Sequence, residues 1–128
     1  PQGAPSGCGG MSTTISDLAR YGMAYTQSGR DLFGDVIPAS YTDLLSTAEP
    51  FLAPEISEGS TGGYPMGLWH WDKVWEDGDM FKLGWGGQGL YVSPRTDSVV
   101  AFFGELDAQQ NKNVMPIVVR DVFSKEKP

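Results

Sequence analysis

The residues best suited to chemistry in this sequence are the glycines at positions 84, 86, 87 and 89, within the stretch Lys82–Pro94. Residues Leu90–Pro94 alternate apolar and polar side chains and stop at a proline, which is typical of a half-buried strand. Glycine destabilises a strand interior, so this cluster indicates either a turn or bulge, or a ligand close to the backbone. In the second case, backbone N–H groups would donate hydrogen bonds to the negative charge that develops during acyl transfer.

Two formal motif matches are better explained by their surroundings. Residues 84–89 fit G-x-G-x-x-G, but a dinucleotide site needs that loop to begin a helix, and a strand is expected here. Residues 124–127 fit S-x-x-K, the nucleophile motif of one class of serine hydrolases. A working motif places its serine at the start of a buried helix, whereas this one lies in a charged tail, where a solvated terminus is expected.

The remaining polar and aromatic residues favour structural roles. His70 is the only histidine, and a surface or structural position is predicted for it, with a hydrogen bond to Asp72 as the alternative. The acidic residues at 76, 77 and 79 predict a solvated hairpin tip, and the tryptophans at 69, 71 and 75 share a parity that predicts one common sheet face. The only cysteine, Cys8, excludes an internal disulfide. Neither a metal site nor an organic cofactor is predicted.

Composition and charge limit the classes of function. The 128 residues suit one domain or part of a larger one, and 40% hydrophobic with 20% charged residues is ordinary for a soluble globular protein. A net charge of −7 and a pI near 4.4 argue against nucleic acid or an anionic membrane surface as a partner. No apolar run approaches the roughly 20 residues of a membrane span, and no signal peptide is visible.

The first half of the chain is predicted to be a loop followed by two helices, over residues 1–47. Thr14 and Asp17 form a capping box at the start of a helix for which Gly29 is the expected end. After a loop through residues 31–38, a second capping box at Ser40 and Asp43 begins a shorter helix that runs to about Thr47. Residues 48–63 are predicted to be irregular, and such a segment is uncommon unless it is functional or packs on another part of the protein.

The second half is predicted to be antiparallel strands over residues 64–104 and a helix over residues 114–124. The strands cover 64–75, 80–83, 90–93 and 99–103, with a hairpin at 76–79 and with the continuous apolar run 99–103 at the centre of the sheet. Pro116 is tolerated in the first turn of the last helix. That helix presents one apolar face, made by Val114, Ile117, Val118 and Val122. This order predicts an α+β fold, with helices packed on an antiparallel β-sheet.

Two segments resemble the β-lactamase-related serine hydrolases, which include class C β-lactamases, D-alanyl-D-alanine peptidases, related esterases and 6-aminohexanoate-dimer hydrolases. Residues 9–22, GGMSTTISDLARYG, are similar to the segment G-G-x-x-S-T-x-x-D-L-A-R-F-G of that superfamily. Residues 84–94, followed by Asp97–Val100, are similar to its strand pair G-x-G-G-Q-x-x-x-V-x-P-x-x-D-x-V-V. The resemblance implies that residues 1–128 are the C-terminal part of a single domain with a partial β-lactamase/transpeptidase-like fold.

The resemblance also implies roles for individual residues. The family's nucleophilic Ser-x-x-Lys and its Tyr motif lie upstream of the first segment, so no catalytic residue is expected in this chain. Residues Trp85–Gly87 match the W-G-G that replaces K-T-G in some family esterases. The lysine that meets a β-lactam carboxylate is then absent, which favours a small ester or amide as the substrate. By carry-over, the N–H of Gln88 is a second oxyanion donor, and Trp85, Gly86 and Gly87 line the acyl side of the cleft. The family's chemistry needs no cofactor, and a periplasmic or secreted location fits it.

Two hypotheses from different classes remain open at this stage. In the first, the chain is the C-terminal segment of a serine hydrolase and is inactive alone. Its partners would be the missing N-terminal part of the domain and, through exposed apolar faces, a second copy of itself. In the second, the chain is a standalone binding or interaction domain that kept the scaffold without the chemistry. An upstream reading frame with Ser-x-x-Lys and a Tyr motif would favour the first hypothesis.

Overall fold

An antiparallel sheet between helices forms the described part of the protein. The computed structural model describes residues 12–47, 50–51, 64–65, 71, 73–75, 77–84, 87–105 and 114–123. In chain order, the elements are α1 (Ile15–Met23), α2 (Gln27–Phe33), α3 (Ala39–Thr47), β1 (Pro50–Phe51), β2 (Tyr64–Pro65), β3 (Lys73–Val74), β4 (Met80–Gly84), β5 (Gln88–Ser93), β6 (Ser98–Phe102) and α4 (Met115–Phe123). The main sheet is a meander of order β3-β4-β5-β6, and β1 pairs with β2. The predicted α+β class is therefore confirmed.

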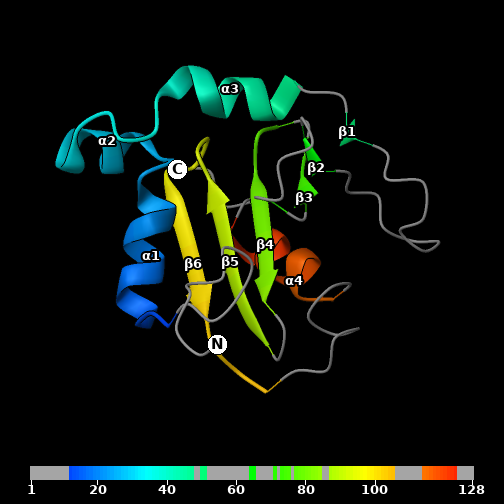
Figure 1. The fold of residues 1–128 in the computed structure, drawn as a ribbon. Helices are drawn as coiled ribbons and strands as arrows, with labels where there is room; N and C mark the ends of the chain where they lie inside the picture. The colour runs from blue at the N-terminus through cyan, green and yellow to red at the C-terminus, as the bar shows by residue number, and fades with distance from the viewer. Residues whose placement is uncertain are drawn as a thin grey trace, which may run out of the picture.

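The helices cover both faces of the main sheet. Helix α1 packs across β5 and β6 on one face, α4 lies on the other, and α3 crosses the upper end of the sheet (Figure 1). Strand residues alternate between these two sides. Met80, Leu90 and Val92 join the core under α1, whereas Phe81 and Tyr91 join the core under α4. Among the described residues, no helix is both long and apolar enough to cross a membrane.

The N-terminal cap of α1 forms where it was predicted. The Thr14 hydroxyl accepts a hydrogen bond from the Asp17 N–H at 3.1 Å and donates one to the Asp17 carboxylate at 2.8 Å. The end predicted at Gly29 is wrong, because α1 stops at Met23 and Thr26 caps a separate helix, α2. Gly29 lies inside α2, where a Cβ would be 1.7 Å from the carbonyl oxygen of Met23. It is glycine because two chain segments meet there, and not because a helix ends there.

The next helix, α3, covers the predicted range, but its predicted cap is wrong. Ser40 is the second residue of the helix and not its N-cap. The segment predicted to be irregular contains β1, which pairs with β2 through Pro50 opposite Pro65 and Phe51 opposite Tyr64. The rest of residues 48–63 lies outside the described residues, as do the glycines at 9 and 10, Cys8, His70, Asp72 and residues 124–127.

The predicted strand 64–75 is not continuous. It contains the short strands β2 and β3, and the common face predicted for the tryptophans is wrong for the two that are described. Trp71 is fully buried in the core under α1, with Tyr25 at a ring-centroid distance of 5.1 Å. Trp75 packs in the core under α4. Parity predicts a face only along one uninterrupted strand, and these residues flank the two-residue strand β3.

The hairpin predicted at Asp77-Gly78 is confirmed. Gly78 has a φ of +85°, and its N–H donates to the Trp75 carbonyl at 2.9 Å, while the Trp75 N–H donates to the Asp79 carbonyl at 2.9 Å. The run 99–103 is predicted to be a central strand covered on both faces. Its central position is wrong, because β6 is the last strand of the described sheet. The coverage is confirmed, since Val99 packs in the core under α1 and Val100 in the core under α4. The last helix is confirmed, but its four-residue apolar face is exposed, and the helix packs through Val119 instead.

Candidate functional site

The glycine stretch forms the turn between β4 and β5. Gly84 and Gln88 are the last paired residues of the two strands, and Gly87 in the turn has a φ of +104°. Glycine adopts this left-handed conformation without the steric penalty of a side chain. Trp85 and Gly86 lie outside the described residues. The turn explanation of the glycine cluster is thus confirmed for Gly87.

Two further glycines make room for the protein's own side chains. A Cβ on Gly84 would lie 2.6 Å from Oε1 of Gln88, and a Cβ on Gly89 would lie 2.2 Å from the ring of Phe102. Close approach at these two positions comes from neighbouring strands, so neither position requires a ligand. The resemblance implies that this turn binds substrate, and that role therefore depends on Gln88 and on the residues just before it.

Gln88 occupies a distinctive position in the sheet. It is the first residue of β5 and its side chain is exposed. It pairs with Gly84 on β4, but pairing with β6 starts one residue later, with Gly89 opposite Phe102. Strand β5 therefore begins one residue before its pairing with β6 begins. Gln88 therefore lies at the end of the sheet, next to the β4–β5 turn.

The two segments that resemble the hydrolases pack against each other, with α1 lying across β5 and β6. The first turn of α1, the β4–β5 turn and the end of β6 all lie at the lower end in Figure 1. A Cβ on Gly104, after β6, would lie 3.9 Å from the Gly87 carbonyl oxygen, which places these two segments side by side. Helix α1 approaches the sheet closely because Gly22 faces Val99 and Leu90. Gly22 and Leu90, about seventy positions apart in sequence, are thus packed together on the α1 face of the sheet.

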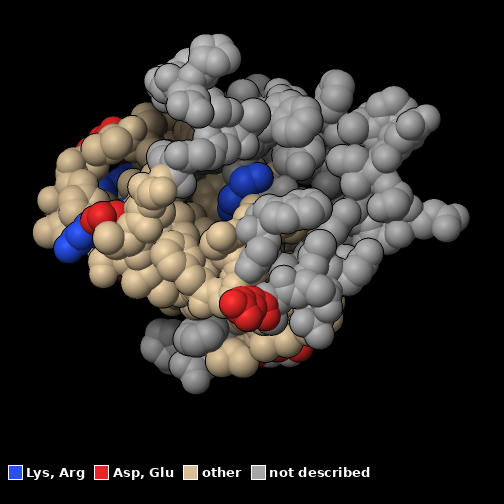
Figure 2. Space-filling model, turned by 60° about the horizontal axis from the view of Figure 1, so that its bottom comes forward, with Lys and Arg blue, Asp and Glu red and all other residues tan. Residues whose placement is uncertain are grey.

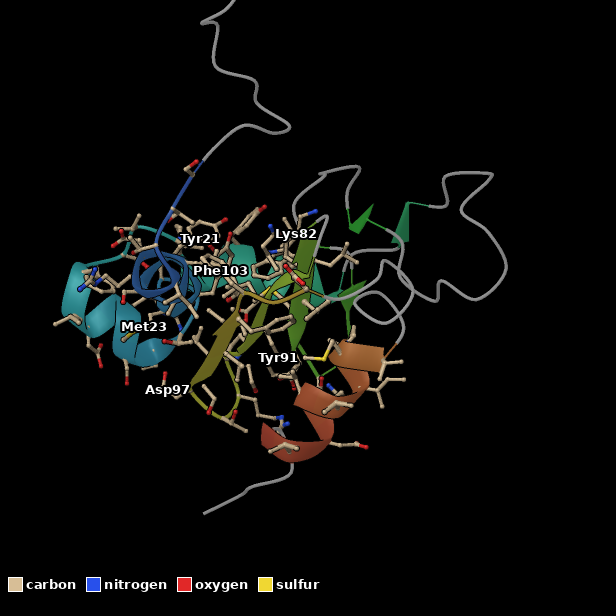
Figure 3. The ribbon with its side chains drawn as sticks, turned by 90° about the horizontal axis from the view of Figure 1, so that it is seen from below. Tyr21, Met23, Lys82, Tyr91, Asp97 and Phe103 are labelled. Atoms are coloured by element: carbon tan, nitrogen blue, oxygen red, sulfur yellow. The ribbon has the colours of Figure 1, made fainter. Side chains whose placement is uncertain are left out.

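A basic side chain, Lys82, lies on the α1 side of the sheet near this end. Lys82 pairs with Leu90, so it shares a face with Gln88 two residues before Leu90 on β5. Seen from below, Tyr21, Phe103 and Lys82 lie on the α1 side of the sheet, while Tyr91 lies on the α4 side (Figure 3). Figure 2 shows basic atoms recessed in a hollow of the lower surface. This side of the sheet end therefore carries the cationic Lys82 and the amide of Gln88.

The phenols on this side are held as neutral groups. The hydroxyls of Tyr21 and Tyr25 are 3.0 Å apart, and Tyr25 also makes an edge contact with Trp71. Burial raises the pKa of Tyr21, and burial together with the Tyr21 hydrogen bond raises the pKa of Tyr25. Both phenols therefore keep their protons at neutral pH and serve as hydrogen-bonding groups.

A charged cluster that sequence reasoning missed lies at the opposite end of β4. Asp79 was predicted to be at a solvated hairpin tip, which is wrong, because it is fully buried. Its Oδ2 lies 3.1 Å from Nη1 of Arg120 and 3.8 Å from Nη2 of Arg95, and it accepts a hydrogen bond from the Tyr91 hydroxyl. Asp77 is bound by Arg120 at 2.6 Å, and that hydrogen bond lowers the pKa of Asp77.

This cluster fixes α4 to the sheet and is not part of the candidate site. Arg120 comes from the middle of α4 and also covers the ring of Trp75 at 4.8 Å. The cluster lies beside Met80, at the start of β4, whereas the glycine turn follows Gly84 at the end of that strand. In the described ranges, no group of three or more His, Cys, Asp or Glu residues could hold a metal ion.

Comparison with known proteins finds a hydrolase. The 6-aminohexanoate-dimer hydrolase of Paenarthrobacter ureafaciens is 33% identical over 95 residues, which cover 72% of this chain and 24% of that protein. The chain resembles part of a hydrolase. No family model and no solved structure matches it. The similarity supports a relationship to the β-lactamase-related superfamily, and the described α+β fold is consistent with part of that fold.

The match covers only a part of this relative. The chain spans about a quarter of the length of this relative. Distant similarity to a hydrolase indicates that this sequence corresponds to a fragment of such an enzyme.

Proposed function

We propose that the chain is the C-terminal segment of a serine hydrolase that cleaves a small ester or amide through an acyl-enzyme. The observation that carries the proposal is the packing of α1, from the first hydrolase-like segment, on β5 and β6 of the second (Figure 1). Sequence identity of 33% to a hydrolase over 95 residues also supports it. The nucleophile and its proton-transfer partners would come from the part of the domain that lies outside this chain.

The glycine turn would form one wall of the acyl site. We assign the second oxyanion donor to the N–H of Gln88, the first residue of β5, because it matches the glutamine of the family's strand pair. Trp85, Gly86 and Gly87 would line the acyl side of the substrate. A donor that is already in place when negative charge develops needs no reorganisation, and losing one such donor reduces kcat by roughly 10²–10³-fold. Rigidity at this position is supported by the pairing of Gln88 with Gly84.

A labelling experiment on two lengths of the protein tests the proposal. The 128-residue chain and the product of its complete reading frame are each treated with a fluorophosphonate probe, and their hydrolysis of p-nitrophenyl butyrate is measured. We expect one labelled serine in the complete protein, in an upstream Ser-x-x-Lys, and none in the 128-residue chain. A label on any serine of the shorter chain would show that it carries its own nucleophile.

The standalone binding domain is the other outcome of this experiment. It is expected if the reading frame opens close to Pro1, without an upstream Ser-x-x-Lys, and if no serine is labelled. The chain would then be a non-catalytic domain on the same scaffold.

A further inference from the structure

Two large apolar side chains stay exposed at the end of the sheet that carries the glycine turn. Ile15 is the first residue of α1, and Phe103 directly follows β6. Each of them is 46% exposed. The first turn of α1 and the end of β6 both lie at the lower end of the sheet, beside the β4–β5 turn (Figure 1).

The packing of α1 on β6 brings these two residues to the same level. Gly22 of α1 faces Val99 of β6, and the two elements run in opposite directions (Figure 1). Ile15 precedes Gly22 by seven residues, which is about 10 Å along a helix. Phe103 follows Val99 by four residues, which is about 13 Å along a strand. Both therefore lie a similar distance below one contact and form an apolar rim between α1 and the sheet.

Phe103 also lies beside the proposed oxyanion donor, Gln88. The last pair of β5 and β6 is Gly89 with Phe102, so one further step along both strands puts Gln88 opposite Phe103. The two segments stay side by side there, because a Cβ on Gly104 would lie 3.9 Å from a carbonyl oxygen of the β4–β5 turn. Directly opposite residues of antiparallel strands have Cβ atoms about 5 Å apart. Phe103 lies on the α1 side of the sheet (Figure 3), the side that Gln88 shares by strand alternation.

We propose that the apolar rim, Ile15 and Phe103, binds the acyl chain of the substrate and makes the enzyme prefer esters or amides with an apolar chain of several carbons. The inference rests on the proposed function, which places the scissile carbonyl at the Gln88 N–H. The acyl chain begins at that carbonyl carbon, so it starts beside Phe103. Methylene groups gain by leaving water against apolar side chains. A charged acyl group would lose hydration there and would gain no partner from these two side chains.

The experiment compares two esters in the product of the complete reading frame. The value of kcat/KM is measured for p-nitrophenyl acetate, whose acyl group ends in a single methyl, and for p-nitrophenyl hexanoate. Phe103→Ala and Ile15→Ala each remove one side of the rim. Phe33→Ala is the matched control, because Phe33 is 40% exposed and ends α2, away from the glycine turn (Figure 1). Thermal unfolding of each variant shows that it is folded.

Phe103→Ala is expected to lower kcat/KM for the hexanoate ester by about 10-fold and to leave the value for the acetate ester within about 2-fold. Ile15→Ala should shift the ratio of the two values in the same direction, and Phe33→Ala should leave both values unchanged. Equal changes for the two esters, or no change, would overturn the inference. A large fall in Tm for Phe103→Ala with an unchanged ratio would show that protein covers the rim, which overturns it as well.

The parent protein separates this inference from the proposed function. If it hydrolyses the acetate ester and carries a labelled serine, but its chain-length preference does not depend on Phe103, the proposed function stands and the inference fails. If it hydrolyses neither ester and no serine is labelled, the proposed function is contradicted. The rim then has no acyl chain to bind, and the inference fails with it.

Discussion

Arg120 of α4 binds the buried carboxylate of Asp79 at the start of β4, with Nη1 and Oδ2 3.1 Å apart. The two residues are 41 positions apart in sequence, and their contact joins the C-terminal helix to the sheet. Asp79 is fully buried, and one of its oxygens, Oδ1, has no hydrogen-bond partner among the described residues. A buried carboxylate of this kind depends strongly on the cations beside it.

Replacing Arg120 by methionine is therefore expected to destabilise the protein by about 3–5 kcal/mol, because Asp79 would lose its nearest cation while staying buried. Urea unfolding monitored by tryptophan fluorescence measures the loss. The matched control is Arg20→Met, which removes an ion pair with Asp17 whose side chains are 64 and 55% exposed. That control should leave the unfolding midpoint unchanged. Equal effects of the two substitutions would show that Asp79 does not depend on Arg120.

The pH dependence of stability should report on Asp97, which joins the β5–β6 turn to α2. Its carboxylate accepts hydrogen bonds from the Ser28 hydroxyl and from the Ser28 N–H at 3.0 Å, and these bonds lower its pKa. A lowered folded-state pKa gives stability that is present above the unfolded value near 3.8 and is lost as the pH falls through the folded value.

Asp97→Asn keeps the side-chain shape and tolerates the φ of +55° at this position, so it isolates the effect of charge. The variant should be less stable than the parent at pH 7, and the difference should shrink at pH 3. Urea unfolding at the two pH values measures it. A difference that is constant across this range would mean that the carboxylate is not ionised preferentially in the folded state.

The close packing of α1 on the sheet should make Gly22 sensitive to substitution. A Cβ there would lie 2.7 Å from Cγ1 of Val99 and 2.9 Å from Cδ1 of Leu90. Gly22→Ala should destabilise the protein by roughly 1–3 kcal/mol through overpacking, although alanine is intrinsically better in a helix by about 1 kcal/mol. Thermal unfolding checks this. Gly104→Ala is the control, since its Cβ would approach only the Gly87 carbonyl, at 3.9 Å.

The assignment of Gln88 as an oxyanion donor concerns its backbone and not its side chain. In the complete protein, Gln88→Ala keeps the N–H and should retain kcat within a few-fold. Gln88→Pro removes the N–H and should lower kcat by roughly 10²–10³-fold. Proline is tolerated at the first residue of a strand, and Tm measurements show whether the variant still folds. Equal kcat values for the two variants would exclude this donor.

Features that depend on neighbouring residues could be predicted from the sequence. The Thr14 cap, the Asp77-Gly78 hairpin and the meander all follow from hydrogen bonds and backbone angles set within a few residues. The two hydrolase-like segments are likewise local patterns, so they could be recognised before their arrangement in space was seen. Local patterns also predicted a turn as one explanation of the glycine cluster.

Tertiary structure alone decided which side chains are buried and by what. Asp79 resembles a solvated turn residue in sequence, and its burial depends on Arg120, which lies 41 positions further along the chain. From the sequence, Gly29 was expected to end a helix. In the structure, glycine is needed there because the Met23 carbonyl leaves no room for a Cβ. The sequence predicted the apolar face of α4, made by Val114, Ile117, Val118 and Val122, but it did not predict that this face is exposed. A side chain is buried by residues that pack against it, and these are often distant in sequence. The immediate neighbours along the chain therefore do not determine burial.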